Sequence, residues 1–161
     1  MFILFNFYGF SAKYCIPHCI AGKKVMSAKI FFDNHLAYKY KYDKEKKKPI
    51  LCFVDKEMMD LCIDVVKALH LKYNTPSDLM LFTLQLLGFT EIQHYTKKAL
   101  KEKKLGVVAL LNEDNSLNCV LQITDKDKKK FLKEAREYYT DKKAYLFDNY
   151  KEFNVEKILN Q

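Results

Sequence analysis

Lysine is the residue type in this chain whose number and placement best predict a chemical role. The 161 residues carry a formal net charge of +8, and Arg136 is the only arginine among the 28 basic residues. A lysine ammonium is a hydrated point charge that suits phosphate oxygens, whereas the planar fork of arginine recognises guanine edges. The charge therefore favours non-specific attraction to a polyanion over base recognition, although AT-rich coding would also enrich lysine.

The lysines that could contact a polyanion gather in two stretches, residues 39–48 and 97–104. We expect both stretches to contribute affinity for nucleic acid, because each lysine–phosphate contact adds to the salt dependence of binding. The predicted contacts in the first stretch are Lys39, Lys41, Lys46, Lys47 and Lys48.

Cysteine and histidine come together once, in the segment Cys15-Ile16-Pro17-His18-Cys19. Structural zinc usually needs four ligands, commonly in two spaced pairs, and His35, His70 and His94 each stand alone in the sequence. We therefore expect no metal site. The five cysteines are an odd number at irregular spacing, which predicts free thiols and fits a reducing cytoplasm.

No set of residues predicts catalysis. Cys62 and His70 lie eight residues apart in a predicted helix, about two turns, so their side chains cannot hydrogen-bond directly. The chain has four glycines and contains no glycine-rich phosphate loop, no G-x-S-x-G and no H-E-x-x-H. We expect neither an enzyme nor a bound cofactor.

The elements that position the first lysine stretch are predicted by its periodicity. Tyrosine and lysine alternate over residues 38–42, which indicates a half-buried strand with the tyrosines on one face and Lys39 and Lys41 on the other. Residues 29–32 form the other strand of a predicted hairpin, and residues 49–54 form an apolar central strand after a charged loop.

Helices and a second hairpin complete a predicted α+β fold. Asp55 is placed to cap an amphipathic helix. Thr75-Pro76-Ser77-Asp78 predicts the start of the next helix, with Thr75 as its N-cap, and Gly88 is its predicted end. The later elements are a helix over 90–104, strands over 105–111 and 117–123, a helix capped by Asp125, and a last helix or irregular tail over 145–159. The fold is thus two antiparallel hairpins and a central strand packed with four to five helices.

A strand, an N-cap aspartate, an amphipathic helix, a tight connection and a second helix follow one another in ILCFVDKEMMDLCIDVVKALHLKYNTPSDLMLFTLQLLG, residues 50–88. This order resembles the ribbon-helix-helix family of dimeric DNA-binding proteins. The resemblance implies that two chains pair one strand each into a ribbon that enters the major groove, and that Thr75 and Ser77 anchor a phosphate. Counting back from Asp55 places Pro49, Leu51 and Phe53 on the outer face of that ribbon, where none of them donates a hydrogen bond to a base.

The N-terminal segment is expected to lie outside the domain. Residues 2–10 are apolar and aromatic and too short to span a bilayer, and Met26 begins a sequence typical of a protein start. We therefore predict a poorly integrated, dispensable extension over 1–25 and a single α+β domain over 26–161. A signal peptide and a membrane-surface anchor are the alternatives for the extension, and no later segment is apolar enough to cross a membrane.

The sequence leads to two hypotheses about function. The first is a cytoplasmic, non-enzymatic, homodimeric nucleic-acid-associated protein related to ribbon-helix-helix regulators. The alternative is a structural or protein-interaction protein with no nucleic-acid role, whose apolar faces over 79–87 and 145–159 bind a protein partner. Binding to heparin or to mixed-sequence duplex over a salt series separates the two.

Overall fold

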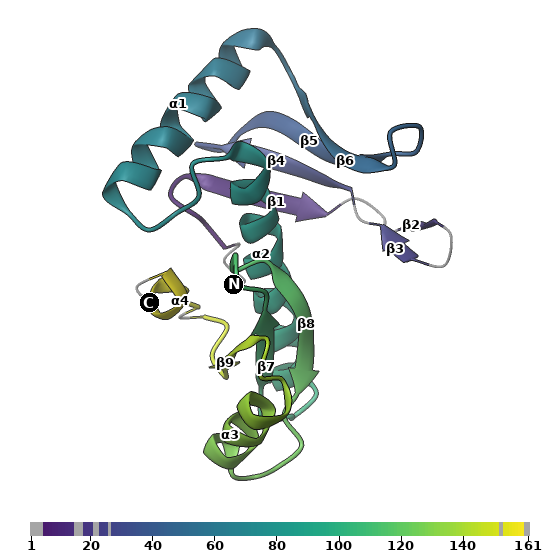
Figure 1. Ribbon diagram of the computed structural model, residues 1–161, viewed down its shortest axis with the longest axis vertical. Coiled ribbons are helices and arrows are strands. Elements are labelled where there is room, and N and C mark those ends of the chain that lie inside the picture. Colours follow the sequence, from purple (N-terminus) through teal and green to yellow (C-terminus); the bar gives the residue numbers. More distant parts are fainter. Residues whose placement is uncertain (1–4, 15–17, 21–22, 26, 152, 160–161) are drawn as a thin grey trace. The chain divides into compact units, whose positions relative to one another are not determined.

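The computed structural model describes residues 5–14, 18–20, 23–25, 27–151 and 153–159. These residues form two larger antiparallel sheets, a short hairpin and four helices, so the predicted α+β class is confirmed (Figure 1). The chain divides into two compact units. We call Asn6–Leu86 the N-terminal unit, and Leu87–Gln161 together with Phe5 the C-terminal unit.

The N-terminal unit is built on a four-stranded antiparallel sheet in the order β1-β4-β5-β6. Its elements are β1 (Phe10–Tyr14), β2 (His18–Ile20), β3 (Lys23–Val25), β4 (Ala28–Phe32), β5 (His35–Asp43), β6 (Lys48–Phe53), α1 (Lys56–Lys72) and the first part of α2 (Leu79–Lys101). Asp33 and Asn34 join β4 to β5, and both have positive φ, as the two central residues of a type I′ hairpin turn require. The predicted hairpin is thus confirmed. The strand predicted over 49–54 is corrected in its place: β6 pairs with β5 at the edge of the sheet and is not a central strand.

One face of this sheet packs on the helices because its strand residues alternate apolar and polar. Phe10, Ile30 and Tyr38 are fully buried, and the Phe82 ring of α2 lies 5.0 Å from the ring of Phe10. The Tyr38 hydroxyl donates to Thr83 Oγ1 at 2.7 Å, and Thr83 in turn donates to the Leu79 carbonyl. The buried phenol is therefore fully hydrogen-bonded, and burial raises its pKa.

Helix α1 begins as the sequence predicts. The Asp55 carboxylate accepts a hydrogen bond from the Met58 backbone N–H at 2.8 Å, which satisfies one of the unpaired donors of the first turn. Cys62 and Val66, one turn apart, are fully buried. This helix contacts β5 and β6 and therefore covers part of one face of the sheet.

The described part of the N-terminal segment does not fit a poorly integrated extension. Phe7, Phe10 and Ala12 are at most 1% exposed, and β1 pairs with β4 along its whole length. The Phe7 ring stacks on Phe82 at 4.7 Å. The expectation for 1–25 is therefore corrected for residues 5–14, where the aromatic residues supply core packing; Met26 lies outside the described residues.

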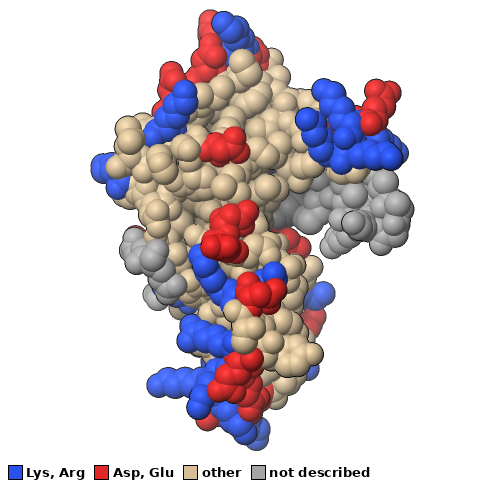
Figure 2. Space-filling model, viewed as in Figure 1, with Lys and Arg blue, Asp and Glu red and all other residues tan. Residues whose placement is uncertain are grey.

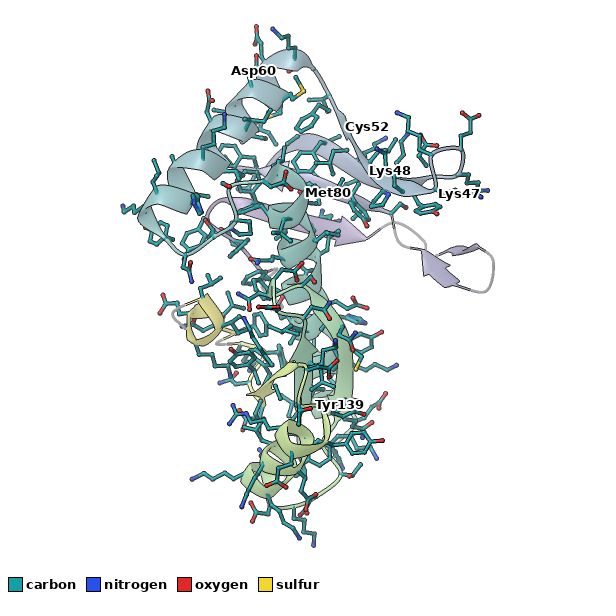
Figure 3. All side chains as sticks on the ribbon, viewed as in Figure 1. Lys47, Lys48, Cys52, Asp60, Met80 and Tyr139 are labelled. Carbon is teal, nitrogen blue, oxygen red and sulfur yellow. The ribbon has the colours of Figure 1, made fainter. Side chains whose placement is uncertain are left out.

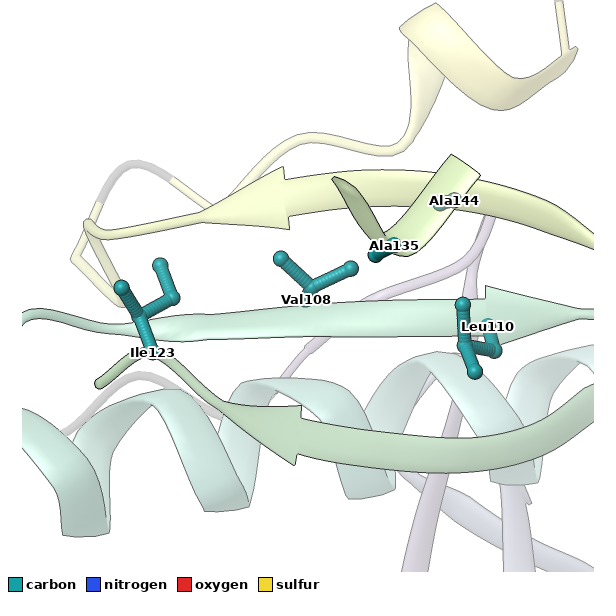
Figure 4. Close-up of a cluster of buried hydrophobic side chains, with 5 residues drawn as sticks. All are labelled: Val108, Leu110, Ile123, Ala135 and Ala144. Atoms are coloured by element: carbon teal, nitrogen blue, oxygen red, sulfur yellow. The ribbon is translucent and has the colours of Figure 1, made fainter. Parts of the chain in front are cut away.

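The C-terminal unit is a three-stranded antiparallel sheet, in the order β8-β7-β9, with helices beside it. Its elements are the rest of α2, β7 (Val107–Leu111), β8 (Leu117–Gln122), α3 (Lys128–Tyr138), β9 (Lys143–Phe147) and α4 (Glu156–Leu159). Every residue of β7, the central strand, is buried. Val108, Leu110, Ile123, Ala135 and Ala144 form the apolar cluster between this sheet and α3 (Figure 4).

Three predictions for this unit are corrected. Gly88 does not end a helix but lies inside α2, which continues to Lys101; a Cβ there would come within 3.0 Å of Leu117 Cβ, so glycine allows β8 to begin against the helix. The cap of α3 is Asp127, which accepts from Lys130 N–H, rather than Asp125. Part of the predicted terminal helix is a strand, β9, because Ala144, Tyr145 and Phe147 are buried along β7.

Candidate nucleic-acid interface

The exposed face of the four-stranded sheet carries a row of lysines across three neighbouring strands. Lys13 of β1 lies directly opposite Lys29 of β4, and Lys29 lies directly opposite Lys39 of β5. All three side chains are exposed, and Cys52 of β6 ends the row opposite Lys39. Directly opposed residues on antiparallel strands have Cβ atoms about 5 Å apart, so three lysine side chains start from one short line across the sheet.

Further basic and apolar residues occupy the same face. We call this surface the lysine face; it consists of Ser11, Lys13, Lys29, Phe31, Lys39, Lys41, Lys48, Ile50 and Cys52. Phe31 is half-buried, and the Lys13 ammonium lies 5.4 Å from the centre of its ring. Ile50 lies directly opposite Lys41.

Within the described ranges, the lysine face carries more positive than negative charge. Among the described residues, none of its five lysines forms a salt bridge. One acidic residue, Asp43 of β5, lies on the same side of the sheet, directly opposite Lys48. Its Oδ1 accepts hydrogen bonds from the backbone N–H groups of Glu45 and Lys46. Like charges directly opposite each other destabilise a sheet, so an anion bound along the row Lys13, Lys29 and Lys39 would relieve this repulsion.

The turn between β5 and β6 adds basic side chains at one end of the face. Figure 2 shows them gathered there, and Figure 3 places Lys47 and Lys48 at the turn and Cys52 further along β6. A groove of about 650 Å³ lies at the outer edge of β6, lined by Lys46, Lys48, Pro49, Ile50, Leu51 and Met80.

The structure brings together most of the predicted nucleic-acid contacts. Lys39, Lys41 and Lys48 share the lysine face, and Lys46 lines the groove beside it with Lys48. The exposed Lys47 belongs to the same turn. Ser77 is exposed in the loop between α1 and α2 and lines no part of the groove.

Thr75 does not fit a phosphate contact. Its side chain is buried, with 3% of the residue exposed, and its Oγ1 has no hydrogen-bond partner. Its carbonyl accepts from His70 Nδ1 at 2.5 Å, which holds the connection close to the end of α1. The N-cap of α2 is Asp78, whose Oδ1 accepts from Leu81 N–H at 2.8 Å, so Thr75 is corrected in both of its predicted roles.

This cap assignment makes a prediction that separates the two residues. Asp78→Ala is expected to lower the free energy of unfolding by about 1 kcal/mol, because Leu81 N–H loses its acceptor. Thr75→Val is expected to leave that free energy unchanged or to raise it, since the buried Oγ1 makes no hydrogen bond. Chemical denaturation of both variants measures these free energies. If Thr75→Val destabilised the protein more than Asp78→Ala, Thr75 and not Asp78 would be the cap.

Lys13 and Lys29 were missed by reasoning from the sequence. A signal for them was present: the triplet Ser-Ala-Lys occurs at residues 11–13 and again at 27–29. In each copy a buried alanine precedes an exposed lysine, and the two lysines become direct partners in the sheet. Each triplet alone is too short to establish a strand, and only the pairing of the strands reveals the row.

The outward face of β6 is also the opposite of the predicted one. Pro49, Leu51 and Phe53 pair with tyrosines of β5, and the Phe53 ring lies 4.8 Å from the ring of the buried Tyr38. They therefore line the helix-covered side of the sheet. The outward positions are Lys48, Ile50 and Cys52.

The cysteines of the described region offer no activated nucleophile. Burial raises the pKa of the Cys62 thiol to about 11, so the thiol stays protonated at neutral pH. Cys52, Cys62 and Cys119 are free thiols. No cluster of histidine, cysteine and acidic residues able to hold a metal occurs in the described part of the chain; Cys15 and Pro17 lie outside it, as do the side chains of His18 and Cys19.

Comparisons of the chain with protein-family models, curated proteins and solved structures found no match. None of the helices in the described ranges has both the length and the apolar character that a membrane span requires. The surface chemistry of the sheet is therefore the basis on which a function is argued.

Proposed function

We propose that this chain is a non-enzymatic nucleic-acid-binding protein whose contact surface is the lysine face. The observation that carries the proposal is the row Lys13, Lys29 and Lys39, in which three exposed lysine residues are direct neighbours across β1, β4 and β5. Phosphates bound along this row would replace the repulsion between lysines with attraction between lysine and phosphate. Binding would also release the counterions of the nucleic acid.

The same surface supports binding with little sequence selectivity. The planar, forked side chains that suit recognition of base edges are those of arginine, asparagine and glutamine, and the lysine face contains none of these. The single arginine, Arg136, belongs to the C-terminal unit, where its Nε and Nη2 donate to the Ala144 carbonyl. The lysines would therefore act as point charges that follow a phosphate backbone.

A dimer of the ribbon-helix-helix kind is a separate part of the proposal. β6 is an edge strand of its sheet, with β5 on one side. A second copy could add its own β6 there and continue the lysine face across both chains. Sedimentation equilibrium measures the oligomeric state. If the protein is a monomer at all concentrations, the dimer is rejected and the lysine face remains the proposed binding surface.

The protein-interaction alternative loses the two surfaces on which it depended. In the stretch 79–87, Phe82, Leu86 and Leu87 are buried, and in the stretch 145–159 Tyr145, Phe147, Ile158 and Leu159 are buried. These apolar faces are covered by the chain's own packing. Among the described residues, the large hydrophobic side chains that stay exposed are those of Val54, Leu61, Leu71, Tyr73 and Tyr138, and Leu71 and Tyr138 are the most exposed, at 87% and 80%.

A salt series tests the proposal. The full chain is expected to bind heparin and mixed-sequence nucleic acid with an affinity that falls linearly in a plot of log K against log salt concentration. It is expected to discriminate little between sequences. The absence of binding near physiological salt would reject the proposal and favour the interaction-protein alternative, and tight sequence-selective binding that survives high salt would contradict both.

A further inference from the structure

We infer that the nucleic acid bound by the lysine face is single-stranded, and that it crosses the strands of the sheet along the row Lys13, Lys29 and Lys39 with a base stacked on Phe31. This inference rests on the proposed function and specifies its ligand. Three observations carry it: the width of the surface, the aromatic ring beside the lysines, and the direction of the lysine row.

The width of the sheet argues against a duplex. The major groove of B-DNA is about 12 Å wide and admits one helix or a two-stranded ribbon. Four strands spaced by about 4.8 Å extend about 14 Å between the axes of the outer two, so the face is too wide to enter the groove. A rigid duplex would touch a surface wider than its groove along a line, whereas a single strand is flexible enough to follow the twist of the sheet.

The ring of Phe31 distinguishes this surface from a purely electrostatic one. Phe31 is half-buried, and the Lys13 ammonium lies over its ring, 5.4 Å from the ring centre. The bases of a duplex are stacked on each other and unavailable, but an unpaired base can stack on such a ring. Lysine is flexible enough for Lys13 to leave the ring for a phosphate when a base takes its place.

The row of lysines sets the line along which the nucleic-acid strand crosses the sheet. Lys13, Lys29 and Lys39 follow the hydrogen-bonding direction of the sheet, perpendicular to β1, β4 and β5. Phe31 lies two residues from Lys29 on β4, to one side of the row. A backbone that follows the row therefore presents its bases toward Phe31 on one side or toward Lys41 and Ile50 on the other.

The test compares fluorescein-labelled oligothymidylate, oligouridylate and a mixed-sequence duplex of equal length by fluorescence anisotropy with the full-length protein. The single strands are expected to bind at least about tenfold more tightly than the duplex. Tighter binding of oligouridylate would assign RNA and tighter binding of oligothymidylate would assign DNA, and both results support the inference.

Two variants of Phe31 test the stacking. Phe31→Leu is expected to weaken single-strand binding about tenfold, while Phe31→Tyr, which keeps the ring, retains it. Thermal melting of both variants by circular dichroism shows whether the fold is intact, and Phe31→Tyr remains informative if Phe31→Leu unfolds. Failure of every nucleic acid to bind would reject the proposed function itself. Duplex binding as tight as single-strand binding, or loss of binding in Phe31→Tyr that equals the loss in a folded Phe31→Leu, would overturn the inference alone.

Discussion

A chain shortened to begin at Met26 is expected to lose the folded N-terminal unit. The truncation removes β1 and with it the fully buried ring of Phe10 and the nearly fully buried ring of Phe7, both of which contact Phe82 of α2. Removal of one buried phenylalanine side chain costs about 3–5 kcal/mol. Two such losses approach or exceed a total stability of about 5–15 kcal/mol, before the loss of the β1–β4 hydrogen bonds is counted.

Thermal unfolding followed by circular dichroism measures this effect. Phe10→Ala in the full chain is expected to lower Tm by about 6–20 °C, since 1 kcal/mol shifts Tm by about 2–4 °C at this size. Lys13→Ala, in the same strand but exposed, is the matched control and is expected to change Tm little. A truncated chain that melts within about 5 °C of the full chain would show that residues 1–25 are dispensable after all.

This prediction reverses the one made from the sequence, and the reason is physical. Before Met26, apolar and polar residues alternate over Phe10–Tyr14, which is too short a stretch to establish a strand from the sequence alone. The burial of Phe7 and Phe10 depends on partners far away in the chain, such as Phe82 and Phe32, and local periodicity does not report such partners. Composition alone suggested an extension where the fold has a core strand.

Local signals succeeded where one short stretch contains the whole cause of an element. The alternation over residues 38–42, the Asp55 cap and the two hairpins are all confirmed, because a strand period, a side-chain acceptor or a tight turn acts within a few residues. Gly88 and Thr75 failed because tertiary contacts override their local preferences. Gly88 is needed inside α2 for the approach of Leu117, and the loop buries Thr75 so that Asp78 takes the cap.

The lysines of the candidate site also divide into those that local signals predict and those that only strand pairing brings together. Lys39, Lys41 and Lys48 could be predicted because they lie in or beside one strand with an evident period. Lys13 and Lys29 could not, because their importance arises from strand pairing across the β1–β4–β5 ladder. A single sequence specifies which face a lysine occupies within a strand, but the register between strands decides which lysines stand opposite one another.

The lysine row itself yields the second large prediction. Lys13, Lys29 and Lys39 changed together to glutamine are expected to weaken nucleic-acid binding at low salt at least about tenfold. The slope of log K against log salt is expected to become shallower by about 2 for a single strand, because each of three lost phosphate contacts contributes about 0.7. Fluorescence anisotropy with one oligonucleotide over a salt series measures both quantities.

A control with the same net charge separates a local site from a general charge effect. Lys126, Lys129 and Lys133 are exposed residues of the C-terminal unit, in or just before α3. Changing these three to glutamine also removes three positive charges, so either variant takes the net charge from +8 to +5. If binding depends on the lysine face, the control keeps most of its affinity and its salt slope. Equal losses in the two variants would show that net charge alone drives binding.

The stability of the same two variants provides an independent measurement. Direct repulsion between Lys13 and Lys29 and between Lys29 and Lys39 disfavours the sheet by roughly a few tenths of a kcal/mol per pair, reduced by solvent and salt. The lysine-face variant is therefore expected to unfold at a slightly higher temperature than the unchanged chain at low salt, and the difference is expected to shrink as salt is added. The control triple variant removes one like-charge pair, Lys129 and Lys133 four residues apart in α3, against two pairs in the lysine-face variant, so its gain is expected to be smaller. If the lysine-face variant is more stable yet binds nucleic acid more weakly, the three lysines lower the stability of the fold and contribute to binding. If the variant binds normally, the lysine row is not part of the interface.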